Sequence, residues 1–237
     1  MTLLNEEMTV GALVSESPAR SRVFERHAID YCCGGKRTLE DACRKKGLDP
    51  ALVIVEIESV DAGPRDDGIN PSDMTMTELA DHIEQTHHAH LREELPRLTA
   101  LTEKVAAVHG DKYPWLKEVK DTYADLVAEL EPHMQKEEQI LFPMIRELDR
   151  ATASPEFHCG SVGNPIKVME HEHDNAGNAL RRLRDLTTDF TPPQNACNSF
   201  RAMLDGLATL EANTHEHIHK ENNVLFVGAA EAEARLG

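Results

Sequence analysis

The sequence has few aromatic residues, no excess of basic residues and no long apolar run. Phe, Trp and Tyr make up 4% of the 237 residues, and the formal net charge is -17 at pH 7. A chain this acidic lacks the basic patch that nucleic-acid binding requires, and the same charge argues against binding to an anionic membrane surface. Because no run of about 18 apolar residues is present, we expect no membrane-spanning segment.

Sheet-forming patterns and signs of secretion are also missing. No stretch sustains the alternation of Val, Ile and aromatic residues with polar ones that marks a strand, whereas Ala, Leu, Glu and Arg are frequent and favour helices. The first residues, MTLLNEEMTV, have neither the basic start nor the long apolar core of a secretory signal. The five cysteines are odd in number and irregularly spaced, which indicates a reducing cytoplasm rather than a disulfide framework.

Turn and linker residues divide the chain into a small N-terminal part and a larger C-terminal part. Residues 1–61 contain short helical patterns, including one that starts after Thr38 and ends at Gly47. Residues 62–73, AGPRDDGINPSD, predict a linker. The remainder, residues 74–237, contains four long helical patterns with short breaks between them. We therefore expect an all-α fold, with a small helical domain followed by an up-down-up-down four-helix bundle. The four patterns lie at roughly 75–109, 114–149, 165–189 and 195–231.

One short stretch of the larger part occurs twice. EPHMQKEEQILFP at residues 131–143 is followed, 84 residues later, by HEHIHKENNVLFV at residues 215–227. Both read His-x-x-x-Glu, then two polar residues, an aliphatic residue, Leu and an aromatic. Two copies in register indicate an internal duplication.

The His and the Glu of each copy fall on the inward stripe of their helix. In the second helical pattern, residues three and four apart form a stripe that includes His133 and Glu137, and in the fourth the stripe includes His217 and Glu221. These four side chains are therefore predicted to face the bundle interior. The full stripes are Tyr123, Leu126, Leu130, His133, Glu137, Ile140 and Met144, and Met203, Leu207, Leu210, Thr214, His217, Glu221 and Val224.

The first and third helical patterns each supply one more inward histidine. In the third pattern it is His173, and in the first the candidates are His87, His88 and His90. We choose His88, because leucines follow it at the same two offsets as they follow His173, although His87 also lies near the apolar face. Glu138 and Glu172 adjoin these donors and are candidates for holding them in place. His90, His171 and His215 are expected at the surface or beside the donors, and His27, His82, His109, His158 and His219 in solvent.

Six ionisable side chains in a helical core are costly unless they are paired or bind metal. A Glu four residues after a His lies about 5–6 Å from it between Cβ atoms, so both can reach one site. Imidazole and carboxylate donors without thiolate suit iron or manganese, with zinc as an alternative. Around two six-coordinate ions, four histidines and two bridging carboxylates leave room for an oxo or hydroxo bridge and for a small molecule. Taken singly, a buried His or an exposed His-x-x-x-Glu pair needs no metal, but the duplication favours a metal site.

The N-terminal part contains the stretch DYCCGGK at residues 30–36. Cys32 and Cys33 are adjacent, and neighbouring residues rarely form a disulfide, which requires Cα atoms at least about 4.4 Å apart. The glycine pair that follows permits close backbone approach or positive φ, and Lys36 and Arg37 favour a thiolate. Two such thiols can hold iron, exchange it with a cluster or undergo redox chemistry, and the alternative is a turn with incidental cysteines. Cys43, Cys159 and Cys197 lack such surroundings and are interpreted as structural.

Taken together, DYCCGGK, HMQKEEQILFP, VMEHEHD and HIHKENNVLF resemble the repair-of-iron-centres family, the YtfE/ScdA type of di-iron proteins, over nearly the whole chain. The resemblance implies a Cys-Cys-Gly-Gly domain followed by a hemerythrin-like bundle that holds two non-haem iron ions with an oxo or hydroxo bridge. It also implies that Cys32 and Cys33 are the catalytic pair that handles iron or nitrosyl groups. Val227 departs from the repeat, whose first copy has Pro143. Carried over by motif, the metal ligands are His88, His133, Glu137, His173, His217 and Glu221.

For function, the resemblance implies repair of iron–sulfur clusters damaged by nitric oxide or oxidative stress. The repair would proceed by iron delivery, by reduction of nitric oxide to nitrous oxide, or by both, with damaged iron–sulfur proteins as partners and nitric oxide or dioxygen as small ligands. The sequence leaves a homodimer through the small domain open. Hemerythrin-like binding or sensing of these gases without turnover is the second hypothesis. A ferritin-like oxidase is disfavoured, because that class uses Glu-x-x-His spacing.

Overall fold

The computed structural model describes residues 4–62 and 70–237, which divide into two compact units. The first unit combines Met1–Leu79, Arg146–Pro155 and Ile218–Gly237, and the second combines Ala80–Ile145 and Glu156–His217. Across the two described ranges the chain forms helices and no strand, apart from an isolated bridge between Thr9 and Thr38. The all-α prediction is therefore confirmed.

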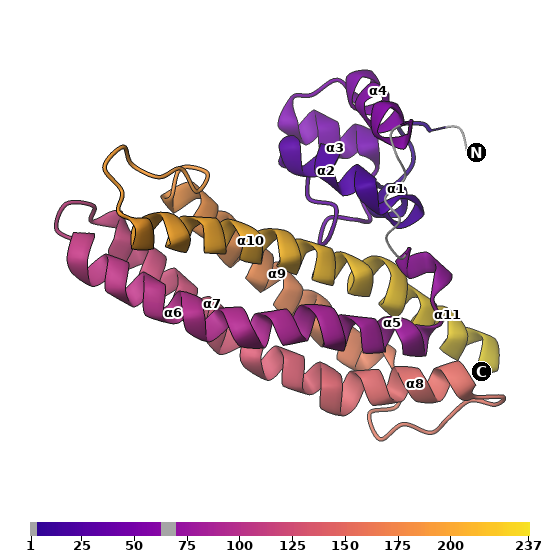
Figure 1. Cartoon of the computed structure of the whole chain (residues 1–237). Helices are drawn as coiled ribbons and strands as arrows, with labels where there is room; N and C mark the ends of the chain where they lie inside the picture. The colour runs from indigo at the N-terminus through magenta and orange to yellow at the C-terminus, as the bar shows by residue number, and fades with distance from the viewer. Residues whose placement is uncertain (1–3, 63–69) are drawn as a thin grey trace. The chain divides into compact units, whose positions relative to one another are not determined.

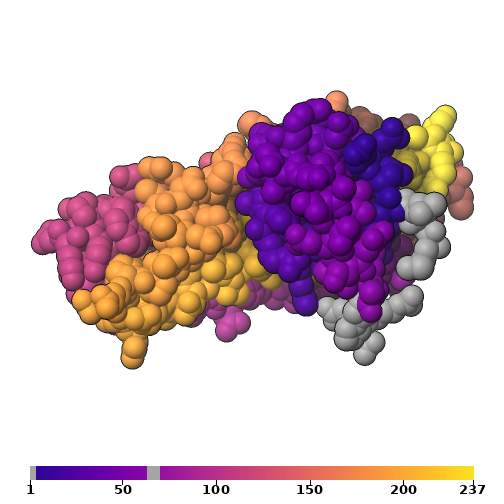
Figure 2. All heavy atoms as spheres, turned by 90° about the horizontal axis from the view of Figure 1, so that it is seen from above, coloured from indigo at the N-terminus to yellow at the C-terminus, as the bar shows by residue number. Residues whose placement is uncertain are grey.

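The N-terminal part of the first unit is a cluster of short helices, which Figure 1 draws in indigo and violet. The third helix begins after Thr38, whose side chain accepts a hydrogen bond from the backbone amide of Asp41. It ends at Gly47, which has a φ of 69°. Asp49 caps the fourth helix ahead of Pro50 at its first position, where proline fits a helix well. Figure 2 shows the side chains of this part gathered in one lobe. The helices are α1 (Val10–Glu16), α2 (Ser21–Arg26), α3 (Leu39–Lys46) and α4 (Pro50–Asp61), with a 3-10 turn at Pro18–Arg20.

These short helices share an apolar core. The most buried members come from all four helices and include Leu13, Phe24, Leu39 and Ile57. Of the predicted linker 62–73, residues 63–69 lie outside the described residues, and Pro71–Asp73 forms a 3-10 turn.

The second unit contains most of the four long helical runs, and α6, α7, α9 and α10 lie side by side in Figure 1. Leucines from these four helices fill its core, together with Tyr123, whose hydroxyl donates to the carbonyl oxygen of Leu95 at 2.9 Å. In neither described range does a helix combine the length and the apolarity needed to cross a bilayer. The runs are α5 (Met76–Ile83) with α6 (Ala89–His109), α7 (Trp115–Lys136) with α8 (Phe142–Arg150), α9 (Gly163–Leu186), and α10 (Asn198–Lys220) with α11 (Phe226–Leu236).

Three of the four runs contain a single π-helical turn, at Glu84–His88, Glu137–Leu141 and Glu221–Leu225. A π turn adds a residue to the helical repeat and so shifts the buried stripe that follows it. The sequence-based stripe is therefore wrong within two of these turns. Ile140 is 41% exposed while Leu141 is 1% exposed, and Val224 is half-buried while Leu225 is fully buried.

Candidate metal centre

Five of the six predicted donors lie in the second unit and come together in its interior. His88 and His217 face each other with 3.2 Å between their Nε2 atoms, and His133 and His173 do the same at 3.1 Å. All four imidazoles are at most 3% exposed. The bundle thus holds two histidine pairs, each built from residues of two different helices.

Glu137 lies between the two pairs. Its Oε2 is 3.3 Å from the Nε2 of His88 and 3.3 Å from the Nε2 of His133, while its Oε1 is 3.9 Å from the Nε2 of His173. This carboxylate is fully buried. One side chain therefore contacts members of both pairs, which is the placement required of a bridging ligand.

Glu221, the sixth predicted donor, belongs to the C-terminal segment of the first unit and is fully buried. It opens a π turn directly after α10, so it follows His217 by four residues on one continuous helical run. Side chains four apart on a helix are neighbours, which keeps Glu221 as the predicted counterpart of Glu137.

The donor set fits a borderline divalent metal such as iron. Nitrogen atoms about 3 Å apart are what two histidines bound about 2.1 Å from one ion present. Burial lowers the pKa of His217 well below its ordinary value, and the neighbouring His88 lowers it further, so this imidazole is neutral. Neutral imidazole is the form that binds metal. Without an ion, facing imidazoles around a buried carboxylate would be expensive in an apolar core.

Two carboxylates contact the Nδ1 atoms of His88 and His133. Glu138 Oε1 lies 2.7 Å from Nδ1 of His88, and Glu172 Oε2 lies 2.9 Å from Nδ1 of His133. Each carboxylate also accepts from a cation, Arg92 for Glu138 and Lys136 for Glu172. With Nδ1 engaged in this way, Nε2 is directed at the centre, as metal-bound histidines usually require. The structure thus supports the predicted holding role of both glutamates.

The same contacts set the charge of Glu172. Burial alone would raise the pKa of this carboxyl, but hydrogen bonds from Lys136 and His133 outweigh burial and lower the pKa. Glu172 is therefore a carboxylate at neutral pH, able to accept the Nδ1 proton of His133.

Two histidines outside the donor set, His87 and His219, are buried. His87 is buried but places its ring parallel to His217, with centroids 5.3 Å apart, and its Nδ1 faces Asn213 Oδ1 at 3.3 Å. His88, and not His87, is thus the first-helix residue whose Nε2 joins the cluster. The prediction that His219 lies in solvent is wrong, because it is 4% exposed and contacts the ring of Tyr31.

The two predicted turn cysteines form a second cluster, in the first unit. Cys32 is buried, Cys33 is half-buried, and their sulfur atoms are 3.9 Å apart. The hydrogen bond to Cys33 and burial both raise the pKa of Cys32 well above its ordinary value. The prediction that Lys36 and Arg37 favour a thiolate is therefore wrong for Cys32, which is a thiol in the folded protein.

Sequence reasoning did not single out Asp30, which organises this turn. Its Oδ1 accepts hydrogen bonds from the amides of Cys32 and Gly34, at 3.2 and 3.0 Å, and lies 3.3 Å from the Cys32 sulfur. The signal was the spacing Asp-x-Cys-Cys, in which a short acceptor precedes a tight turn.

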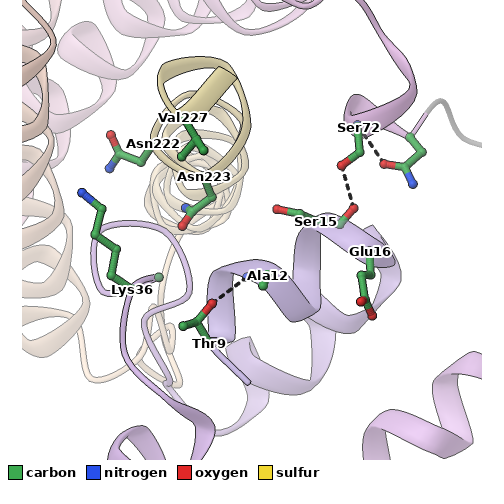
Figure 3. A pocket seen from close by; sticks show the side chains of 11 residues that line it. Thr9, Ala12, Ser15, Glu16, Lys36, Ser72, Asn222, Asn223 and Val227 are labelled. Carbon is green, nitrogen blue, oxygen red and sulfur yellow. Dashed lines mark hydrogen bonds between the residues drawn. The ribbon is translucent and has the colours of Figure 1, made fainter. Parts of the chain in front are cut away.

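The glycine pair is explained by close approach rather than by positive φ. A Cβ on Gly34 would lie 2.8 Å from the carbonyl oxygen of Asp30, and a Cβ on Gly35 would lie 2.2 Å from Oδ1 of Asn223. The side-chain Nδ2 of Asn223 also donates a hydrogen bond to the carbonyl oxygen of Cys32 at 3.1 Å. A pocket of about 490 Å³, which Figure 3 shows, lies beside this turn and is lined in part by Gly35, Lys36 and Asn223. Neither cysteine of the turn lines this pocket.

An all-α bundle with buried histidine pairs around a shared carboxylate defines a hemerythrin-like cation-binding protein. Residues 79–227 match the Hemerythrin HHE cation binding domain, and residues 6–61 match a domain of unknown function, DUF542. The match of the first of these covers more than half of the chain.

Relatives along almost the full length identify the family. The chain is 38% identical over 229 residues to the iron-sulfur cluster repair protein YtfE of Musicola paradisiaca (strain Ech703), which covers 96% of this chain and 98% of the relative. It is 37% identical over 225 residues to the protein of the same name from Yersinia pseudotuberculosis (serotype O:1b, strain IP 31758), covering 95% of this chain and 97% of the relative. The chain belongs to the YtfE family of iron–sulfur cluster repair proteins, as its motifs predict.

Proposed function

We propose that this protein repairs iron–sulfur clusters damaged by nitric oxide or oxidative stress, and that it does so with two iron ions held in the bundle. The observation that carries the proposal is Glu137, a buried carboxylate in contact with both histidine pairs. The name shared by the full-length relatives supports the repair function.

In this proposal each histidine pair would hold one ion, His88 with His217 and His133 with His173. Glu137 and Glu221 would be the two carboxylates shared between the ions. When bound, ferrous iron with an oxo or hydroxo bridge would supply open positions for nitric oxide or dioxygen and electrons for their reduction. The protein's part is to keep His217 neutral, to aim the Nε2 atoms of His88 and His133, and to hold the donors in a buried position.

The turn cysteines complete the proposal. We assign Cys32 and Cys33 the handling of iron or nitrosyl groups during transfer to damaged iron–sulfur proteins, which are the partners. Five free cysteines fit a reducing compartment, so we propose a cytoplasmic location. A homodimer through the small domain stays a prediction.

The domain division also stays a proposal. Residues 1–61 would be the Cys-Cys-Gly-Gly domain, 62–73 the linker and 74–237 the bundle, and the two family matches, at residues 6–61 and 79–227, are compatible with these bounds.

The test is recovery of a damaged enzyme. An iron–sulfur enzyme inactivated by nitric oxide is incubated with the iron-loaded protein, with an equal amount of free ferrous iron, or with the Glu137→Gln variant treated in the same way. We expect faster recovery with the iron-loaded protein than with either control. Equal rates in all three reactions would rule out repair by this centre.

Reversible binding or sensing of gas is the second candidate, and the burial of the centre favours it. The five bundle donors are at most 3% exposed, so a large substrate cannot contact them unless the bundle moves. Production of nitrous oxide separates the two functions. Reduction consumes two nitric oxide molecules, two electrons from ferrous iron and two protons, and yields nitrous oxide and water. A sensor would bind nitric oxide and release it unchanged.

A further inference from the structure

We propose that Asp30, Cys32 and Cys33 together form a three-donor site for one divalent ion of the Fe²⁺ or Zn²⁺ class. The inference deepens the proposed function, because it names what the cysteine turn holds and adds a carboxylate to it. The role of the ion in repair rests on that function, whereas the site itself rests on the geometry of the turn.

The three donor atoms already have the spacing of ligands around one ion. Two sulfurs bound at about 2.3 Å to a tetrahedral ion lie about 3.8 Å apart, and an oxygen bound at about 2.0 Å lies about 3.5 Å from each sulfur. In the turn, the sulfurs of Cys32 and Cys33 are 3.9 Å apart, and Oδ1 of Asp30 is 3.3 Å from the Cys32 sulfur. All three atoms lie within 4.8 Å of one another.

The turn fixes this spacing through its backbone. Oδ1 of Asp30 is held by the amides of Cys32 and Gly34, so the carboxylate cannot swing away from the sulfurs. The missing side chain of Gly34 makes room for the carboxylate, because a Cβ there would lie 3.2 Å from both Cγ and Oδ2 of Asp30. A site that is organised before the ion arrives loses little conformational freedom on binding.

Partial exposure makes this a site for exchange rather than for storage. Cys32 is 4% exposed, while Cys33 and Asp30 are half-buried, so the ion would be reached from the side of these two residues. Three protein donors leave the fourth tetrahedral position to water or to an incoming ligand, whereas structural zinc sites use four. Binding converts two thiols and one free ion into a dithiolate complex and two released protons, with no electron transferred.

The experiment is a titration of the full-length, iron-loaded protein with Co²⁺. Absorption from thiolate-to-cobalt charge transfer reports sulfur ligands alone, and the five bundle donors placed by the structure contain no sulfur. We expect this band to saturate near one Co²⁺ per chain and to disappear in the Cys32→Ser, Cys33→Ser double variant. Cys197→Ser, which alters an exposed cysteine, is the matched control and should leave the titration unchanged.

The part of Asp30 is tested by Asp30→Asn. The amide oxygen of Asn can still accept from the amides of Cys32 and Gly34, so the turn should keep its shape while the anionic donor is lost. We expect affinity for Co²⁺ to fall at least tenfold with the thermal melting curve unchanged. If this variant binds Co²⁺ with wild-type affinity, Asp30 is not a ligand. If the wild-type protein shows no thiolate-to-cobalt band, the turn does not bind an ion.

The outcomes are independent of cluster repair. A protein that shows the band yet fails to restore a damaged enzyme keeps the site and loses the proposed function. A protein that restores the enzyme without any cysteine-dependent band keeps the function and loses the site.

Discussion

The two donor clusters of this protein are built in opposite ways. The bundle centre gathers nitrogen and oxygen donors from helices far apart in sequence, and its five second-unit donors are at most 3% exposed. The cysteine turn takes its three sulfur and oxygen donors from a span of four residues, 30–33, and leaves two of the three donor residues half-buried. The first design suits retention of an ion, and the second suits its exchange.

The difference also lies in what holds the donors. In the bundle, Glu138 holds His88 and Glu172 holds His133 through the Nδ1 atoms, and each glutamate is itself paired with a cation. In the turn, the ligand Asp30 is fixed directly by backbone amides. The bundle centre can therefore be weakened by substitutions that touch no proposed ligand, whereas in the turn the carboxylate that the backbone holds is itself a proposed ligand.

The largest expected effect is loss of the shared carboxylate. Glu137→Gln removes the charge in contact with both histidine pairs, so bound iron should fall from two ions per chain to one or none, as measured by elemental analysis after dialysis. The Co²⁺ band of the turn should remain. Full iron content in this variant would show that Glu137 does not bridge the ions.

The next largest effect concerns Glu138 and Glu172, the glutamates that hold His88 and His133. Glu172→Gln and Glu138→Gln should each lower iron affinity about 10–100-fold, since outer-shell partners of metal-bound histidines contribute about that much. Competition with a chelator measures the affinity. Glu93→Gln, at an exposed position, is the control with the same chemical change and should have no effect.

The pH dependence of folding separates the two regions in the metal-free protein. His217 has a pKa lowered from 6.5, so its contribution to stability is intact above pH 6.5 and is lost as pH falls through the folded pKa. Cys32 has a pKa raised well above 9.0, so its contribution is intact below pH 9.0 and is lost as pH rises through the folded pKa. Each contribution changes by at most about 1.4 kcal/mol per pH unit.

Urea unfolding across this range should therefore show a plateau with an acid arm and an alkaline arm. His217→Gln should make the acid arm shallower and leave the alkaline arm unchanged, and Cys32→Ala should make the alkaline arm shallower and leave the acid arm unchanged. If either substitution changes the opposite arm, the assignment of that arm is wrong.

The smallest expected effect is on the free energy of unfolding and concerns Thr214, at a position where the two repeats differ. Thr214 occupies the position that Leu130 holds in the first repeat, and its hydroxyl is fully buried with no hydrogen-bond partner among the described residues. An unpaired buried hydroxyl costs about 1–3 kcal/mol, so Thr214→Val should raise the free energy of unfolding of the metal-free protein by about 1 kcal/mol.

The same substitution at Thr187 should change the free energy of unfolding in the opposite direction. The hydroxyl of Thr187 is also buried but donates to the carbonyl oxygen of Leu183 at 2.8 Å and accepts from the amide of Phe190. Thr187→Val should therefore lower the free energy of unfolding. Equal effects in the two variants would show that Thr214 has a partner.

The helices and the inward position of the four histidines could be predicted because helical periodicity and the 84-residue repeat constrain the same positions. The π turns could not, since no residue type marks them, and this is why Ile140 and Val224 were assigned to the wrong face. The burial of His219 depends on Tyr31, almost two hundred positions away, and periodicity within one helix carries no information about such a contact. Asp30 could have been predicted, because it lies two residues before Cys32 in the spacing Asp-x-Cys-Cys.

Anomalous X-ray diffraction at the iron absorption edge tests the central claim most directly. Crystals of the iron-loaded protein should show two peaks in the bundle, one between His88 and His217 and one between His133 and His173, with Glu137 in contact with both. A single peak, or peaks confined to the surface of the protein, would contradict the two-iron centre.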